Sequence, residues 1–249
     1  SHGAMVGRMI EAIEKILINE CPDLVLVYGD TNSTLAGALA SVKCNFQVAH
    51  IESGLRSFDR TMPEEINRVI TDKISSILFC PSENAVAQLK KEGISNNVFF
   101  TGDVSLDNII HFGKLSEKYS TITKKLKLEN SHFALMTCHR PENTDNFENL
   151  SVIVDTAAYI SNKIKLVMPI HPRTKKLLEK MCLIEKLSNV IITEPLSFFD
   201  ILALQKKSNL ILTDSGGIQK EAFFLKKPCI TIRNRSEWIE TVEIGVNKL

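Results

Sequence analysis

Apolar and polar positions follow two rhythms along this chain. Short apolar runs rich in branched and aromatic side chains are typical of buried strands, and longer stretches with apolar residues at helical spacing separate them. The runs that predict strands are 24–28, 46–51, 77–80, 98–101, 133–137, 165–170, 190–193, 210–213 and 229–232. Strands that alternate with helices favour parallel sheets covered by helices, so the predicted fold class is α/β.

The segment 113–131 interrupts this pattern, because it is polar, rich in lysine and has no predicted strand. The chain of 249 residues also exceeds the usual size of one hydrophobic core. We therefore expect two Rossmann-like domains, residues 1–118 and 119–249. The chain opens on a helical pattern with no strand before it, so we expect the first strand to be missing and the native protein to extend beyond one or both ends.

The composition is that of an ordinary globular protein, with 44% hydrophobic and 24% charged residues. The chain has 30 basic and 29 acidic residues, so it lacks the positive excess that would hold a nucleic-acid backbone. No apolar run reaches the roughly 18 residues of a spanning helix, and residues 1–10 lack the pattern of a targeting signal. We expect a cytoplasmic protein with neither nucleic acid nor membrane as a partner.

The cysteines contain no CxxC pair, and several of them fall inside apolar strands. This spacing supports neither a disulfide framework nor a zinc site. We expect all six to be reduced core residues: Cys21, Cys44, Cys80, Cys138, Cys182 and Cys229.

Acidic residues follow two predicted strands in the first half of the chain. Parallel sheets place their ligands beyond the carboxyl ends of the strands, which makes such positions candidates for chemistry. Asp30 follows strand 24–28, where it either caps the next helix or faces a ligand. Glu52 ends strand 46–51, and a buried glutamate is unfavourable unless something uses it.

A helix expected to begin at Pro63 carries a second group of charges. Glu64 and Arg68 share one face through their i, i+4 spacing, either as an ion pair on a solvated face or as part of a ligand site. Acids from several strand ends of one sheet can converge around a ligand. Such a cluster can take up and release protons.

Histidine and arginine follow two predicted strands in the second half of the chain. His139 and Arg140 come after strand 133–137, and His171 and Arg173 come after strand 165–170. These positions suit phosphate binding or proton transfer. A hydrogen-bonded structural histidine is an equal alternative for His139.

The strongest local signal is TDSGGIQKEA, which follows strand 210–213. We expect Ser215, Gly216 and Gly217 to form a tight turn into a helix that carries Glu221. Glycines allow a ligand to approach the backbone, and the exposed N–H groups with the helix dipole suit a phosphate or diphosphate. The turn matches neither a P-loop nor GxGxxG, and a purely structural turn is the alternative.

With these motifs assembled, the chain resembles the non-hydrolysing UDP-N-acetylglucosamine 2-epimerase family. The matching stretches are SHGAMVGRMIEAIEKIL, GDTNSTLAGALA, HIESGLRSFDRTMPEEINR, TCHRPENTDN, HPRT, TDSGGIQKEAFFLKKPCITIR and EWIETVEIG. The resemblance implies a GT-B-like fold, with a UDP-sugar bound in the cleft between two Rossmann-like domains. It further implies no metal, no cofactor, a role in polysaccharide biosynthesis and a homodimer, which the apolar helix at 4–19 also favours.

The resemblance also implies a role for each candidate residue. The catalytic residues would be Asp30, Glu52, Glu64 and His139. The diphosphate would bind at Ser215, Gly216 and Gly217, and the ribose hydroxyls would bind Glu221. Arg68 would orient the acids or the substrate, and contacts to a nucleotide would come from Arg140 and His171.

The reaction of this family explains why several acids would be needed. The proton on carbon 2 of an N-acetylhexosamine is not acidic, because no carbonyl is attached to that carbon. UDP therefore leaves first from carbon 1, and the cation-like sugar then loses the proton to give a glycal. A proton returns to the opposite face and UDP adds back, which converts UDP-N-acetylglucosamine to UDP-N-acetylmannosamine.

The stretch at 236–238 leaves the substrate open. It reads SEW where many members have TERP, and such variants resemble epimerases of UDP-2,3-diacetamido-2,3-dideoxyglucuronate. Three further alternatives are a hydrolysing epimerase, a retaining GT-B glycosyltransferase and a non-catalytic UDP-sugar-binding protein.

Overall fold

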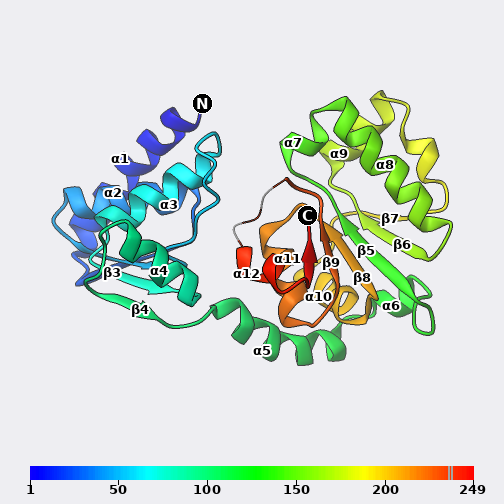
Figure 1. The fold of residues 1–249 in the computed structure, drawn as a ribbon. Helices are drawn as coiled ribbons and strands as arrows, with labels where there is room; N and C mark the ends of the chain where they lie inside the picture. Colours follow the sequence, from blue (N-terminus) through cyan, green and yellow to red (C-terminus); the bar gives the residue numbers. More distant parts are fainter. Residues whose placement is uncertain (235, 237) are drawn as a thin grey trace. The chain divides into compact units, whose positions relative to one another are not determined.

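The chain folds into two compact units, Ser1–Val104 and Ser105–Leu249 (Figure 1). The computed structural model describes residues 1–234, 236 and 238–249. In this part of the chain, every pairing between neighbouring strands is parallel. The predicted α/β class with parallel sheets and two Rossmann-like units is therefore confirmed.

The first unit contains a parallel sheet with a helix between each pair of consecutive strands. Within the described residues its strands lie side by side in chain order: β1 (Leu24–Tyr28), β2 (Gln47–Ile51), β3 (Ile77–Cys80) and β4 (Val98–Phe100). Its helices are α1 (His2–Glu20), α2 (Asn32–Lys43), α3 (Pro63–Ile74) and α4 (Glu83–Lys91). The register joins Tyr28 to Ile51 and Ile51 to Phe79, so three strands end at one edge. The loops that follow these strands emerge together.

The second unit contains a sheet in the order β10-β9-β8-β5-β6-β7. Its described strands are β5 (Phe133–Thr137), β6 (Lys165–Pro169), β7 (Ile191–Thr193), β8 (Leu210–Thr213), β9 (Cys229–Thr231) and β10 (Asn247–Lys248). Its described helices are α5 (Val104–Tyr119), α6 (Ile122–Lys125), α7 (Pro141–Thr144), α8 (Phe147–Ser161), α9 (Pro172–Lys180), a 3-10 helix (Ile184–Leu187), α10 (Phe198–Lys207), α11 (Gly216–Phe224) and α12 (Ile239–Glu243). All nine predicted strands are confirmed, and β10 is an addition.

The order of this sheet defines where it can bind a ligand. The chain runs from β5 outward to β6 and β7 and then returns to β8 on the other side of β5. Thr137 and Thr213 end these two central strands in register, and their hydroxyl oxygens are 2.6 Å apart. Parallel α/β sheets bind ligands where the strand order reverses, beyond the carboxyl ends of the strands. The loops after β5 and β8 start at that point.

Helix α5 belongs to the second unit. The ring of Phe112 packs edge-on against Phe198 of α10, with centroids 5.7 Å apart. Lys206 of α10 donates to the Gly113 carbonyl at 3.0 Å and pairs with Glu117. The two compact units consequently divide at 104/105, before the expected domain boundary at 118/119.

The six cysteines are all free, as expected. Cys80, Cys138 and Cys229 are buried, but the expectation of core positions is wrong for Cys21 and Cys182, which are exposed, and Cys44 is half-buried. Those three follow helices instead of lying in strands, and Cys21 and Cys182 adopt the left-handed backbone common at helix ends.

None of the helices in the described part of the chain combines the length and apolar character that a membrane crossing requires.

Candidate active site

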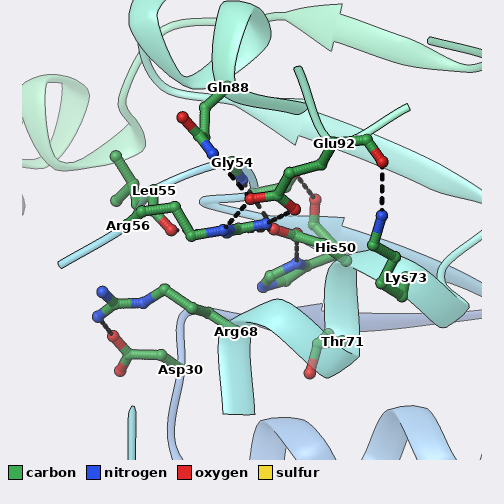
Figure 2. Close-up of polar contacts among 12 residues, drawn as sticks. Asp30, His50, Gly54, Leu55, Arg56, Arg68, Thr71, Lys73, Gln88 and Glu92 are labelled. Atoms are coloured by element: carbon green, nitrogen blue, oxygen red, sulfur yellow. Dashed lines mark hydrogen bonds and ion pairs between the residues drawn. The ribbon is translucent and has the colours of Figure 1, made fainter. Parts of the chain in front are cut away.

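Asp30 is an ion-pair partner and not a helix cap. The cap of α2 is Thr31, whose hydroxyl accepts from the Thr34 backbone N–H in a capping box. The expectation that Asp30 could cap this helix is therefore wrong. Its carboxylate instead pairs with the guanidinium of Arg68 on α3 (Figure 2).

Glu52 lies beside the turn that carries Asp30. A methyl group at Gly29 would come 3.2 Å from Oε2 of Glu52, so the carboxylate occupies the space next to that glycine. Gly29 has φ +64° and Glu52 has φ +76°. Left-handed backbone at a non-glycine residue is uncommon and is found disproportionately at functional sites. The Glu52 carboxylate thus lies beside Gly29, the residue that precedes Asp30, and both Gly29 and Glu52 are left-handed.

Arg68 links two carboxylates. Its side chain is 4% exposed, and its Nη1 donates to Oε2 of Glu65 at 2.9 Å while Nη2 donates to Asp30. The expectation of a solvated ion pair with Glu64 is wrong, because Arg68 is buried and its carboxylate partners come from Asp30 and Glu65. Glu64 is half-buried in the first turn of α3, one turn before Arg68 on the same face.

Two further residues of α3 bind the loops at the carboxyl edge of the first sheet and were not predicted. Glu65 accepts from the Ser57 backbone N–H at 2.8 Å and from the Phe58 backbone N–H at 3.0 Å. Asn67 donates from Nδ2 to the Asp30 carbonyl at 2.9 Å. In the sequence these residues resemble ordinary polar positions of a helix, because their partners lie in other segments.

The loop after Glu52 is fixed by α3 and α4. Gly54 donates its N–H to Asp72 of α3 at 3.1 Å and has φ +82°. A side chain at Gly54 would lie 2.4 Å from the carbonyl oxygen of Ala85 in α4, so only glycine fits. Arg56 donates from Nε and Nη2 to the two carboxylate oxygens of Glu92, each at 2.8 Å (Figure 2).

The charges of this network reinforce one another. Burial alone lowers the pKa of Arg56, but the hydrogen bonds and charges of Glu92 and Asp72 outweigh it, so the pKa is raised. The hydrogen bond from Arg56 in turn is the main cause that lowers the pKa of Glu92. Both groups therefore remain charged around neutral pH, and the bidentate pair holds the loop.

In the second unit, Asp214 organises the loop after β5 and was not predicted. Its buried carboxylate accepts from the backbone N–H groups of His139 and Arg140, each at 2.9 Å, and from Nδ2 of Asn143 at 3.1 Å. An aspartate that ends a buried strand beside the SGG turn was a usable signal. The same argument that selected Glu52 applies to it.

His139 combines a fixed backbone with an accessible ring. Its Nδ1 is 3.3 Å from Oδ1 of Asp214, and its side chain is 54% exposed. A carboxylate at Nδ1 favours a proton there, so Nε2 is the atom available to a ligand. Arg140 is half-buried, and the second unit brings these two residues to the switch point of its sheet.

The SGG motif begins α11. Ser215 is the N-cap, and its hydroxyl accepts from the Ile218 backbone N–H at 3.4 Å. Gly216 and Gly217 form the first helical turn, whose N–H groups have no acceptor within the helix. The first atom that a methyl group at Gly217 would meet is the Ser215 hydroxyl at 3.8 Å. This helix start is open to an anion.

Two other predicted residues belong to helices α11 and α9 of the second unit. Glu221 of α11 accepts from Nε2 of Gln205 at 2.7 Å; burial raises the pKa of Glu221, against the opposing effects of Gln205 and Lys220. His171 is the N-cap of α9, where Nδ1 accepts from the Arg173 backbone N–H at 3.3 Å. That contact leaves Nε2–H of the exposed ring as a donor.

Within the described residues, no group of three or more His, Cys, Asp or Glu side chains could hold a metal ion. At the edge of the first sheet, Asp30 and Glu65 pair with Arg68, and Glu65 also accepts from backbone N–H groups.

Comparisons with known proteins agree over the full chain. A family model described as UDP-N-acetylglucosamine 2-epimerase matches residues 1–249. A UDP-N-acetylglucosamine 2-epimerase homolog of Methanococcus maripaludis is 52% identical over all of this chain and 70% of its own length. The UDP-2,3-diacetamido-2,3-dideoxy-D-glucuronate 2-epimerase of Pseudomonas aeruginosa is 46% identical over all of this chain and 69% of its own.

A solved structure shares the fold. The UDP-GlcNAc 2-epimerase of Methanocaldococcus jannaschii, crystallised in complex with UDP-GlcNAc and UDP, superposes with a TM-score of 0.91 at 45% identity. The match covers all of this chain and 70% of that protein. Together with the family model and the acids placed at the sheet edge, these matches show that the chain belongs to the UDP-N-acetylglucosamine 2-epimerase family.

Proposed function

We propose that this chain inverts carbon 2 of UDP-N-acetylglucosamine to give UDP-N-acetylmannosamine. The observation that carries the proposal is the placement of two acids at the left-handed turn of Gly29: Asp30, which pairs with Arg68, and Glu52, whose carboxylate lies beside Gly29. A cluster of this kind suits proton exchange at a carbon atom. The anion-binding start of α11 suits the diphosphate of the same substrate.

The order of bond changes follows from the acidity of the substrate. Carbon 2 carries no carbonyl, so UDP departs from carbon 1 before the proton on carbon 2 is lost. The bonding electrons leave with UDP, and loss of the proton gives a glycal. Return of a proton on the opposite face, with addition of UDP to carbon 1, completes the inversion.

The acids of the first unit divide into two roles. Arg68 and Asn67 hold the carboxylate and the carbonyl of Asp30, so this residue is suited to orient the sugar. Glu52 and Glu64 are the pair that we assign to proton exchange, one for each face of carbon 2. Glu52 sits at a strained backbone position beside Gly29, which fixes its direction.

The second unit handles the leaving group. The first turn of α11, with the N–H groups of Gly216 and Gly217, and the cap Ser215 would hold the diphosphate. His139 would stabilise the negative charge that develops as UDP departs, with Arg140 and His171 as further nucleotide contacts. Glu221 would accept hydrogen bonds from the ribose. The proposal requires both units to act on one substrate molecule.

The test is solvent exchange at carbon 2. Purified protein is incubated with UDP-N-acetylglucosamine in deuterated water, and the sugar is examined by NMR and mass spectrometry. We expect one deuterium at carbon 2 of UDP-N-acetylmannosamine and of recovered substrate. Turnover without deuterium at that carbon would refute the proposed route, and release of free N-acetylmannosamine would indicate a hydrolysing enzyme.

A second substrate is favoured by a specific observation. The SEW stretch at 236–238 resembles epimerases of a diacetamido-uronate, and such an epimerase is 46% identical to this chain. Arg235 and Glu237 lie outside the described residues, whereas the Trp238 ring lies 4.5 Å from Nζ of Lys220 in α11. Parallel assays with UDP-N-acetylglucosamine and UDP-2,3-diacetamido-2,3-dideoxyglucuronate compare the two kcat/KM values.

We also propose a cytoplasmic homodimer. Helix α1 exposes large apolar side chains, with Met5 at 43%, Ile16 at 59% and Ile18 at 62% exposure. Such side chains on one helix suit a contact between copies of the chain. Light scattering on the purified protein measures its mass, and a monomeric mass would reject this part of the proposal.

A further inference from the structure

A buried hydrogen-bond chain runs from α3 to the backbone beside Asp30. His50 of β2 is fully buried; its Nδ1 lies 2.7 Å from Oδ1 of Asp72, and its Nε2 lies 2.7 Å from the Gly29 carbonyl oxygen. Figure 2 shows the ring between the Arg56 network and α3. The Gly29 carbonyl belongs to the peptide that joins Gly29 to Asp30. His50 therefore holds the peptide from which the Asp30 side chain emerges.

The ring of His50 donates from Nε2 to the Gly29 carbonyl, because a carbonyl oxygen can only accept. On the other side of the ring, Nδ1 lies 2.7 Å from one oxygen of Asp72. Arg56 and Gly54 donate to the other oxygen of Asp72 at 2.7 Å and 3.1 Å. Asp72 therefore ties the ring to Arg56 and to the loop after β2.

The turn at Gly29 is held from several sides. Its N–H donates to the Ile51 carbonyl at 3.0 Å, and its own carbonyl accepts from His50. The next carbonyl, that of Asp30, accepts from Asn67 at 2.9 Å. Two consecutive carbonyls are thus fixed by side chains from β2 and α3. A shift of either peptide changes the separation between the Asp30 and Glu52 carboxylates.

We propose that His50 is a positioning residue for the acids of the first unit. Its Nε2–H fixes the left-handed turn at Gly29. The turn sets the distance between Asp30, which orients the sugar, and Glu52, which exchanges a proton at carbon 2. His50 does not reach the substrate and moves no proton to it. The inference rests on the proposed epimerase function and adds to it a residue inside strand β2. Asp72 supports the ring from the opposite side.

Two amide variants separate the two hydrogen bonds of the ring. In His50→Gln the side-chain amide reaches the position of Nε2 and can still donate to Gly29, whereas in His50→Asn it reaches only the position of Nδ1 and can still donate to Asp72. Each variant loses one buried hydrogen bond, so we expect similar losses of Tm. We expect kcat of His50→Asn to fall about 10- to 100-fold with KM within about twofold, because small misplacements of catalytic groups have effects of this size. His50→Gln should retain kcat within about threefold.

The control is Thr71→Val, a same-shape change on the turn of α3 that carries Asp72. The Thr71 hydroxyl is buried and has no hydrogen-bond partner in the described part of the chain. We expect wild-type kcat and KM for this variant. Equal losses of kcat in His50→Asn and His50→Gln, or no loss in either, would overturn the proposal.

A second readout keeps this inference separate from the proposed function. Should the wild-type protein turn over neither UDP-sugar, the proposed function fails, and hydrogen exchange of residues 28–32 then tests the turn directly. Faster exchange in His50→Asn than in His50→Gln and Thr71→Val supports the role of Nε2. Identical exchange in all three variants and the wild type overturns it.

Discussion

Arg68 donates to the carboxylate of Asp30, which lies 38 positions earlier in the chain, in the turn between β1 and α2. The same guanidinium donates to Glu65 within its own helix, so one buried cation joins the edge of the sheet to α3.

Arg68→Met should lower both stability and turnover. The change leaves the buried Glu65 carboxylate without its cation, and breaking a buried pair on one side costs about 3 kcal/mol of unfolding free energy. Loss of the Asp30 contact should lower kcat about 100-fold. Urea unfolding and steady-state kinetics measure the two effects. Lys15→Met removes an exposed pair with Glu11 and serves as control, with a change of less than about 0.5 kcal/mol.

Gly29→Ala should impair activity more than its backbone strain explains. The variant places a methyl group 3.2 Å from Oε2 of Glu52 at a position with φ +64°. Gly93→Ala is the matched control, because φ there is +78° and a methyl group would meet nothing within 4 Å. Both should lose about 1 kcal/mol of stability from strain. Only Gly29→Ala should also lower kcat, and equal kcat in the two variants would contradict the placement of Glu52.

Glu221→Gln should stabilise the protein at neutral pH but not in acid. Burial raises the folded-state pKa of Glu221 above its usual value of 4.5. The protonated carboxyl group of Glu221 contributes fully to the unfolding free energy below the pKa that Glu221 has in the unfolded state. This contribution is lost as the pH rises through its pKa in the folded state. Glutamine stays neutral at every pH. Urea unfolding should therefore show no gain in unfolding free energy for the variant below about pH 4, and a gain that grows as the pH rises.

The control for this pH series is Glu129→Gln, which changes an exposed glutamate. We expect it to stay within about 0.5 kcal/mol of the wild type at each pH. An advantage of Glu221→Gln that is constant from acid to neutral pH would mean that ionisation of Glu221 is not its cause.

His139→Asn should separate catalysis from stability. The ring is 54% exposed, so its loss should change the unfolding free energy by less than about 1 kcal/mol. Removal of one group that stabilises the departing diphosphate should lower kcat about 100-fold. Thermal unfolding and initial rates measure the two quantities. His132→Asn, another exposed histidine of the same unit, is the control and should leave kcat unchanged.

Much of the fold and part of the site could be predicted because they depend on local pattern. Buried parallel strands are apolar runs, and ligands of such sheets lie after the strand ends, which selected Asp30, Glu52 and the SGG turn. Strand β10 was missed because two residues carry no periodicity. The packing of α5 on α10 was also not predicted, because the aromatic contact that joins these helices is tertiary.

The partners of the charged residues could not be predicted. Arg68 has acids at both i−4 and i−3, and it pairs with the buried Glu65 and not with the half-buried Glu64. Asp72 lies 22 positions from His50, so no local spacing indicates their contact. A histidine within the apolar run 46–51 was nevertheless a signal, because a buried imidazole needs partners for its polar atoms.

The loop after β2 has consequences for how a substrate is received. Gly54 is wedged against the Ala85 carbonyl, and Arg56 is tied to Asp72 and Glu92. This stretch gains its order when the chain folds, not when a ligand arrives. Binding of a ligand therefore carries no entropic cost for ordering this loop. The enthalpy of binding should accordingly reflect contacts to the sugar nucleotide and not the ordering of the loop.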